Sequence, residues 1–352
     1  MKPEPTFRHP PLRPGMIDAP HQSAALGDLR LESGQVIRDF VMSYVVHGTF
    51  NAARDNAILA LSAVGANHHR LDFLIGPGRA LDTSQYCVIA VDAIGNGLST
   101  SPSNSSSQSG MRFPSFVIRD MVHSQHRLLA EVLGVTKLFA VCGASMGGMQ
   151  ALQWAVSHPA GVQHCVAMTP MARTAPWARA VNEATRRTLM ADPAWNGREF
   201  TGPVTRGWEA WAVISRVLIN RTPDAIGSDY PEPAALHAWL GRITDEVLEN
   251  GFDATDWLYQ TRAYDAHDVG TTPGHGGDTN SALQSIRART LVLAPPLDLY
   301  NPTSAAREAA AAIPDARFVE IPSMQGHQAA SGLKEAEAEF LNRQIAMFLA
   351  PT

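Results

Sequence analysis

Ser145 has the sequence context of a catalytic nucleophile. It lies in Gly143-Ala-Ser-Met-Gly147, which follows an apolar strand-like run and leads directly into a helix-like segment. A sharp turn between a buried strand and a helix strains the backbone at the serine, exposes its hydroxyl and requires small residues where strand and helix crowd together. The amide of Met146 then points toward whatever the serine oxygen attacks. A structural serine in a tight turn is the alternative, but the strand-turn-helix context favours a nucleophile.

A serine hydroxyl is a weak nucleophile unless a base takes its proton and an acid orients the base. In architectures with this turn, the acid and then the histidine follow the serine in the chain, each on a loop after a late strand. Asp298 ends one such strand-like run, and His327 comes just beyond the final one. We therefore predict that Ser145, Asp298 and His327 form a catalytic triad. The alternatives are that Asp298 caps the helix expected after it and that His327 is a surface histidine.

Two backbone amides must hold the negative oxygen of the tetrahedral intermediate. Met146, directly after the nucleophile, supplies the first. The second should come from the loop after the strand-like run 57–63, which reads Ser62-Ala-Val-Gly-Ala66. We predict that the amide of Val64 is this donor. Each such donor typically lowers the barrier by about 2.7–4 kcal/mol.

Other histidines have different interpretations. His123 and His126 are spaced as a metal pair on a helix, but no third ligand is close in the sequence, so surface or structural roles are favoured. His68 and His69 follow an early strand near the expected mouth of the site, where they either touch a ligand or are solvated in a loop. The sequence contains no HExxH, no CxxC and no glycine-rich phosphate loop. We expect neither a metal nor a cofactor.

Composition restricts the function further. The chain has 352 residues and a net charge of −5, which argues against a surface that binds nucleic acid or an anionic membrane. Its three cysteines lie in apolar runs, which indicates buried thiols and a reducing compartment. No secretory signal or membrane-spanning stretch is evident. We therefore expect a cytoplasmic protein that acts on a small molecule.

Strands and helices must alternate to position these residues. After about thirty residues rich in proline, interpreted as an extended arm, apolar runs typical of strands alternate with segments of helical spacing. Such alternation predicts an α/β fold with a mainly parallel sheet and helices on both faces. The expected strands are 36–47, 57–63, 86–91, 138–142, 162–168, 290–293 and 317–321, and the expected helices are 116–133, the segment that ends at 157, 304–312 and 334–349.

The alternation stops at about residue 171 and resumes at about residue 289. The segment between carries six of the seven tryptophans in helical stretches and loops. We interpret it as a helical lid, inserted over the carboxyl edge of the sheet and hinged near 271–278. The predicted organisation is a core of residues 1–170 and 286–352 with a lid of residues 171–285.

Several stretches together match the pattern of one family. They are 143–155, 74–78 with 81–83, 118–122, Asn182-Glu183 through Arg186 to Asp192-Pro193, 195–197 and 258–263. On these residues the chain resembles the homoserine O-acetyltransferase family of α/β-hydrolase-fold proteins over nearly its whole length. The resemblance implies the same triad, an acyl-enzyme, a helical lid and often a homodimer. Arg186 falls where the transferases place an arginine that binds the substrate carboxylate; retention for lid packing is the alternative.

Three departures from the family pattern bear on the activity. The transferases carry a His-Ala-Leu-Thr-Gly type loop at 62–66 and a Gly-Gly-Cys-x-Gly-Ser-Thr-Gly-Pro type segment at 93–102, and this chain has neither. Their catalytic histidine precedes an aspartate that helps to receive the amino acid, whereas Gln328 follows His327 here. Because an ammonium in a partly dry pocket needs an anionic or multi-acceptor site, this change weakens the case for homoserine. The pattern resembles the esterase branch of the family.

The main hypothesis is a serine carboxylesterase that hydrolyses short-chain acetyl esters of simple alcohols without a cofactor. One alternative is an acyl-CoA-dependent acyltransferase that acts on homoserine or another hydroxyl acceptor. A second alternative is a binding module that keeps the fold and uses the pocket for recognition only. The complete set of Ser145, Asp298 and His327 argues against this last possibility.

Overall fold

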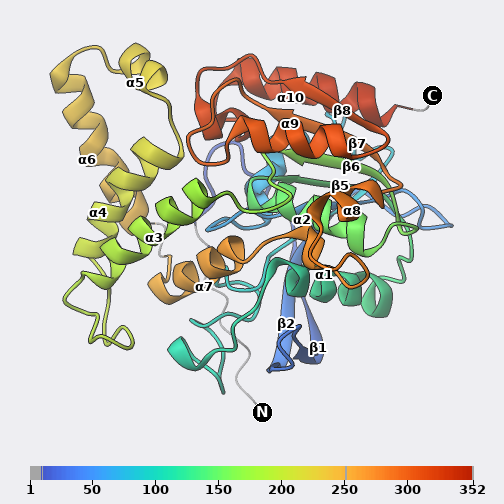
Figure 1. Cartoon of the computed structure of the whole chain (residues 1–352), viewed down its shortest axis with the longest axis horizontal. Helices are drawn as coiled ribbons and strands as arrows, with labels where there is room; N and C mark the ends of the chain where they lie inside the picture. The colour runs from blue at the N-terminus through green and yellow to red at the C-terminus, as the bar shows by residue number, and fades with distance from the viewer. Residues whose placement is uncertain (1–8, 10, 250–251, 351–352) are drawn as a thin grey trace.

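An eight-stranded sheet forms the centre of the part of the chain that the structure describes, namely residue 9 and residues 11–249 and 252–350 (Figure 1). The strands are β1 (His21–Arg30), β2 (Val36–His47), β3 (Ala57–Leu61), β4 (Cys87–Val91), β5 (Leu138–Ala144), β6 (Val162–Met168), β7 (Arg289–Ala294) and β8 (Ala316–Glu320). In this computed structural model they are ordered β1-β2-β4-β3-β5-β6-β7-β8. Among these described strands, β2 pairs antiparallel with β1 and with β4, and all other neighbours pair parallel. The predicted α/β-hydrolase fold with a mainly parallel sheet is therefore confirmed.

The central strands are buried on both faces. Every residue of β3 and β4 is buried, and both strands are continuous apolar runs rather than alternating ones. A parallel sheet covered on both faces requires such runs. This explains why the apolar segments alone locate these strands.

The prediction of an extended arm is wrong for residues 21–30. They form β1, which pairs antiparallel with β2 from His21 opposite Val45 to Arg30 opposite Val36. The register shifts around Gly27, and buried positions are interspersed with exposed ones. Because an edge strand buries only part of its surface, its sequence lacks the apolar run that marks the central strands.

Helices cover both faces of the sheet, as predicted (Figure 1). Helices α1, α2 and α9 pack on the face formed by residues such as Leu59 and Val141. Helix α10 and the short 3₁₀ helix η1 (His68–Leu74) pack on the opposite face, against Ala60 and Leu291. The bounds are α1 (Ile118–Arg127), α2 (Met146–Ser157), α9 (Thr303–Ala312) and α10 (Glu335–Leu349). None of the described helices has the length and apolar character needed to cross a bilayer.

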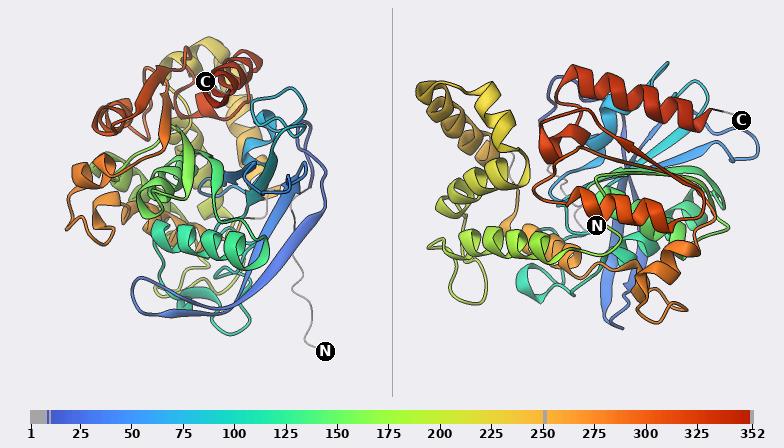
Figure 2. Two further views of the ribbon diagram at one scale, coloured as in Figure 1. Left: turned by 90° about the vertical axis from the view of Figure 1, so that its right-hand side faces the viewer. Right: turned by 45° about the horizontal axis from the view of Figure 1, so that its top comes forward.

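The helical insertion extends from β6 beyond the end of the sheet (Figure 2). Its tryptophans Trp208, Trp211 and Trp257 form a cluster with edge-to-face contacts, separate from the main core. Its last part is different, since Tyr264 and Leu283 belong to the main core. The helices are α3 (Pro176–Met190), α4 (Arg206–Ile214), α5 (Pro223–Asp229), α6 (Pro233–Glu249), α7 (Ala254–Asp265) and α8 (Thr279–Gln284).

Candidate active site

Ser145 lies at the sharp turn between β5 and α2. Its backbone has φ 59° and ψ −124°, a conformation that costs energy for a residue with a Cβ and that persists only where its surroundings impose it. The amide of Ser145 donates to the carbonyl of Met168 at 2.9 Å and to Oγ1 of Thr169 at 3.2 Å. The end of β6 therefore holds the strained residue in place.

The glycines beside Ser145 allow close approach of the backbone. A Cβ on Gly143 would lie 2.2 Å from the carbonyl carbon and oxygen of Gly147. A Cβ on Gly147 would lie 2.7 Å from the carbonyl oxygen of Leu61, at the end of β3. Because the opposing atoms belong to the backbone, they cannot move away as a flexible side chain could.

We expect Gly143→Ala to destabilise the protein by more than about 4 kcal/mol, because the methyl group has no space and the turn must open. The measurement is the free energy of unfolding in urea, together with the yield of soluble protein. Gly241→Ala is the matched control. Gly241 is exposed within α6 with open space around it, so this change should instead stabilise by about 0.5–1 kcal/mol. Equal stability of the two variants would contradict the prediction.

The structure brings Ser145, Asp298 and His327 together. Nε2 of His327 is 2.8 Å from Oγ of Ser145, and Nδ1 of His327 is 2.7 Å from Oδ2 of Asp298. The other carboxylate oxygen, Oδ1, accepts the amides of Tyr300 and Asn301 at 2.8 and 3.0 Å. The carboxylate is therefore fixed on both sides, and the imidazole bridges it to the hydroxyl.

A second layer of polar residues holds this arrangement. Nδ2 of Asn301 donates to the carbonyl of Thr169, and the hydroxyl of Tyr264 donates to Oδ1 of Asn301. The ring of Tyr300 packs edge-on against His327 with centroids 5.1 Å apart. Burial raises the pKa of Tyr264 and of Tyr300, which keeps both hydroxyls neutral. The sequence analysis did not identify these residues, although Tyr300 and Asn301 directly follow the predicted acid.

The two predicted oxyanion donors lie on adjacent elements. Met146 is the first residue of α2, so its amide has no partner within the helix. Val64 follows β3 and lines the same cavity as Ser145. In that loop the amide of Gly65 donates to Oε1 of Gln260, and the amide of Ala66 donates within the loop. These two amides are occupied, which leaves Val64 as the better candidate.

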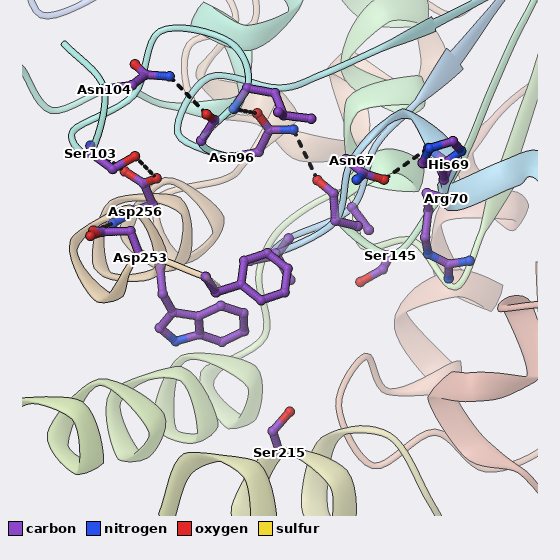
Figure 3. A pocket seen from close by; sticks show the side chains of 18 of the residues that line it. Asn67, His69, Arg70, Asn96, Ser103, Asn104, Ser145, Ser215, Asp253 and Asp256 are labelled. Atoms are coloured by element: carbon purple, nitrogen blue, oxygen red, sulfur yellow. Dashed lines mark hydrogen bonds between the residues drawn. The ribbon is translucent and has the colours of Figure 1, made fainter. Parts of the chain in front are cut away.

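Ser145 and His327 open into a cavity of about 1280 Å³ between the core and the helical insertion. Figure 3 shows Ser145 facing Ser215 across this space, with Asp253 and Asp256 to one side. Arg70 also lines the cavity, and burial lowers its pKa to about 10, so it stays charged at neutral pH.

Arg186 does not line this cavity. Its guanidinium pairs with Asp265 at 2.7 Å and with Glu183 at 3.0 Å. The structure thus places it in the packing of α3 against α7, the second of the two roles considered above. Arg70 and Arg216, which the sequence analysis did not select, are cationic residues that do face the cavity.

Asp256 is a buried carboxyl group in the cavity wall. Burial raises its pKa well above the usual value, and neighbouring Asp253 adds to the shift, while Ser103 donates to both of its oxygens. The folded state therefore keeps this proton to a higher pH than the unfolded chain does. It follows that stability falls as the pH rises from the normal aspartate range through the raised pKa.

We expect Asp256→Asn to remove the loss of stability at higher pH, because the amide stays neutral. The thermal midpoint at neutral pH should rise by a few degrees. The asparagine can still accept a hydrogen bond from the amide of Ser103 and donate one to its hydroxyl. Thermal unfolding of both proteins between about pH 4 and pH 8 measures the effect. Asp245→Asn, an exposed substitution on α6, is the control and should leave the curve unchanged. A variant less stable than the wild type at neutral pH would contradict the prediction.

The other histidines and the cysteines also have defined environments. His126 stacks on His158 with centroids 4.3 Å apart, as expected for a structural role. The solvated-loop interpretation of His68 and His69 is wrong, because both are buried and pair with aspartates. The three cysteines are buried free thiols, as predicted.

Comparisons with known proteins give consistent matches. The family described as alpha/beta hydrolase fold matches residues 65–204. A homoserine O-acetyltransferase of Solidesulfovibrio magneticus is 32% identical, and the match covers 90% of this chain and 90% of that protein. A protein named probable esterase from Corynebacterium glutamicum is 30% identical, with 88% of this chain and 90% of that protein covered. The crystal structure of an acetylester hydrolase from Corynebacterium glutamicum has a TM-score of 0.88 at 29% identity, covering 94% of this chain and 96% of that one.

Proposed function

Because this chain belongs to the homoserine O-acetyltransferase-like family of α/β-hydrolase-fold proteins, we propose that it is a serine esterase that hydrolyses short-chain acetyl esters. The observation that carries the proposal is the hydrogen-bonded chain from Ser145 through His327 to Asp298. The likeness to an acetylester hydrolase over 94% of the chain supports the choice of acyl group.

In the proposed reaction, Oγ of Ser145 attacks the ester carbonyl carbon while Nε2 of His327 takes the hydroxyl proton. Asp298 orients the imidazole and stabilises its positive charge. The amides of Met146 and Val64 hold the oxyanion. His327 then gives its proton to the leaving alkoxide, and the acetyl group stays on Ser145. Water, deprotonated by His327, releases acetate in the second half of the cycle.

Gln328, the residue that follows the general base His327, favours water over an amino acid as the acceptor of the acetyl group. Gln328 lines the cavity beside His327 and offers a neutral amide rather than a carboxylate. The position directly after His327 therefore provides no carboxylate for the ammonium group of an amino-acid acceptor.

An acyl-CoA-dependent O-acyltransferase is the second candidate. It is favoured by the relatives named homoserine O-acetyltransferase, which match most of the chain. The two reactions share the acyl-serine intermediate. They differ in the acyl donor, an ester or an acyl-CoA thioester, and in what removes the acetyl group, water or a hydroxyl acceptor.

Mass spectrometry of the intact protein tests both steps. After a brief reaction with an activated acetate ester, the wild type should gain one acetyl group, and Ser145→Ala should gain none. The adduct should decay in water at a rate that homoserine does not increase. Decay only in the presence of homoserine, with formation of its O-acetyl ester, would identify a transferase instead.

A further inference from the structure

We propose that His9, His68 and His69 form a binding site for a divalent transition-metal ion, specifically Zn²⁺. The site lies where the N-terminal arm, here residue 9 and residues 11–20, meets η1. Nε2 of His9 is 3.3 Å from Nε2 of His68 and 3.1 Å from Nε2 of His69. Ligand atoms of the three residues all lie within 4.8 Å of one another. The site is separate from the triad, and it stands whether or not the triad hydrolyses esters.

The separations fit tetrahedral zinc. With Zn–N bonds of about 2.0–2.1 Å, a tetrahedral ion places its ligand nitrogens about 3.3–3.4 Å apart. The two Nε2 distances at His9 are close to this value before any ion is present. Three imidazoles and a water molecule complete a four-coordinate site, and imidazole is a ligand that suits zinc.

The second ring nitrogens of His68 and His69 are held as they are in known zinc sites. Nδ1 of His68 lies 3.0 Å from Oδ2 of Asp92, and Nδ1 of His69 lies 2.6 Å from Oδ2 of Asp72. A carboxylate that accepts the Nδ1 proton fixes the tautomer and turns the lone pair of Nε2 toward the metal. The two buried rings therefore present acceptor nitrogens toward His9.

Both carboxylates are well anchored. Asp92 accepts from the amide of His68 at 2.9 Å and from the hydroxyl of Ser43. Asp72 also accepts the amide of Ile17 at 2.7 Å. A second group of potential metal ligands in this region consists of His21, His68 and Asp92. Hydrogen bonding explains its close spacing, because Nε2 of His21 contacts Oγ of Ser43 and Oδ2 of Asp92.

The burial and the spacing of these nitrogens suit a divalent cation. The side chains of His68 and His69 are 3% and 4% exposed, so water has little access to their nitrogens. Nε2 of His9 lies within 3.3 Å of Nε2 of His68 and 3.1 Å of Nε2 of His69, so the three nitrogens converge on one region. A divalent ion binds all the nitrogens at once and offsets the charge of the two buried carboxylates.

The ion would fasten the arm to the wall of the substrate cavity. His69 lines that cavity beside Arg70 (Figure 3), and so do Arg13 and Met16 of the arm. The hydrogen bond from Ile17 to Asp72 is the next link between the arm and η1. With the metal joining His9 to η1 as well, the arm contacts one wall of the cavity at two points, His9 and Ile17.

Metal binding by the full chain, prepared without an affinity tag, tests the proposal. Elemental analysis of the purified protein should find about one Zn²⁺ per chain. After removal of metal by a chelator, Co²⁺ should produce the visible absorption of a tetrahedral site, and Zn²⁺ should displace it. Hydrogen exchange of the segment 11–20 should slow when Zn²⁺ is added.

His9→Ala is the decisive variant, because His9 lies outside the sheet and its loss should leave the fold intact. We expect it to weaken Zn²⁺ binding at least about 100-fold. His237→Ala, an exposed histidine on α6, is the matched control and should bind as the wild type does. No tetrahedral Co²⁺ spectrum, or equal affinity in His9→Ala and wild type, would show that the three imidazoles are joined by hydrogen bonds alone and would overturn the proposal.

Discussion

Replacing Ser145 by alanine should lower kcat for a short-chain acetate ester by about 10⁶-fold, because the acyl-enzyme can no longer form. The imidazole of His327 would remain beside a methyl group with nothing to deprotonate. Alanine keeps the Cβ, so the backbone strain at φ 59° should not change. We therefore expect the fold to be preserved.

Ser215→Ala is the matched control for this substitution. Ser215 faces the same cavity from the helical insertion (Figure 3), and it is as buried as Ser145. Its change to alanine should leave kcat within about twofold, which corresponds to about 0.4 kcal/mol of barrier. Steady-state kinetics and circular dichroism of both variants give the comparison. A Ser145→Ala protein that keeps a tenth of the wild-type rate would exclude Ser145 as the nucleophile.

Asp298→Asn should lower kcat by about 10⁴-fold with little loss of structure. Oδ1 must remain an acceptor, because it receives the amides of Tyr300 and Asn301. The new NH₂ group then occupies the position of Oδ2 and faces Nδ1 of His327. The imidazole must therefore carry its proton on Nε2, where it can no longer take the proton from Ser145.

The pH profile distinguishes this effect from a general loss of folding. A variant trapped in the wrong tautomer should recover part of its rate at high pH, where stronger bases in solution can take the serine proton. Asp278→Asn, at the N-cap of α8, is the control, because asparagine caps a helix as well as aspartate does. The N-cap of α9 is Pro302, so Asp298 does not cap this helix. If Asp298→Asn retained full activity, Asp298 would only order the loop through the amides of Tyr300 and Asn301.

The turn at Ser145 could be predicted because every requirement for it is local. The apolar run of β5, the small residues at 143 and 147 and the helix that follows all lie within a short segment. Asp298 and His327 could be predicted only from their order and from the strands before them. Their contact depends on β5, β6, β7 and β8 lying side by side in this order. The alternation of strands and helices predicts a parallel sheet but not the order of its strands.

The features that the sequence analysis missed depend on partners far away in the chain. Strand β1 is recognisable only through β2, since its own apolar pattern is weak. His68 looks like a loop residue until Asp92 is brought beside it by the neighbouring strand β4. Arg186 has a sequence position that suggests ligand binding, but Asp265, from another helix, neutralises it. Such pairings are set by tertiary packing rather than by local pattern.

The order of Ser145 and His327 along the chain has a consequence during synthesis. The two side chains meet at 2.8 Å but are separated by 182 positions. A growing polypeptide on the ribosome therefore contains Ser145, the proposed nucleophile, long before His327, the proposed base, has been translated. Until β8 pairs with β7 and brings residue 327 into place, the hydroxyl of Ser145 has no imidazole beside it.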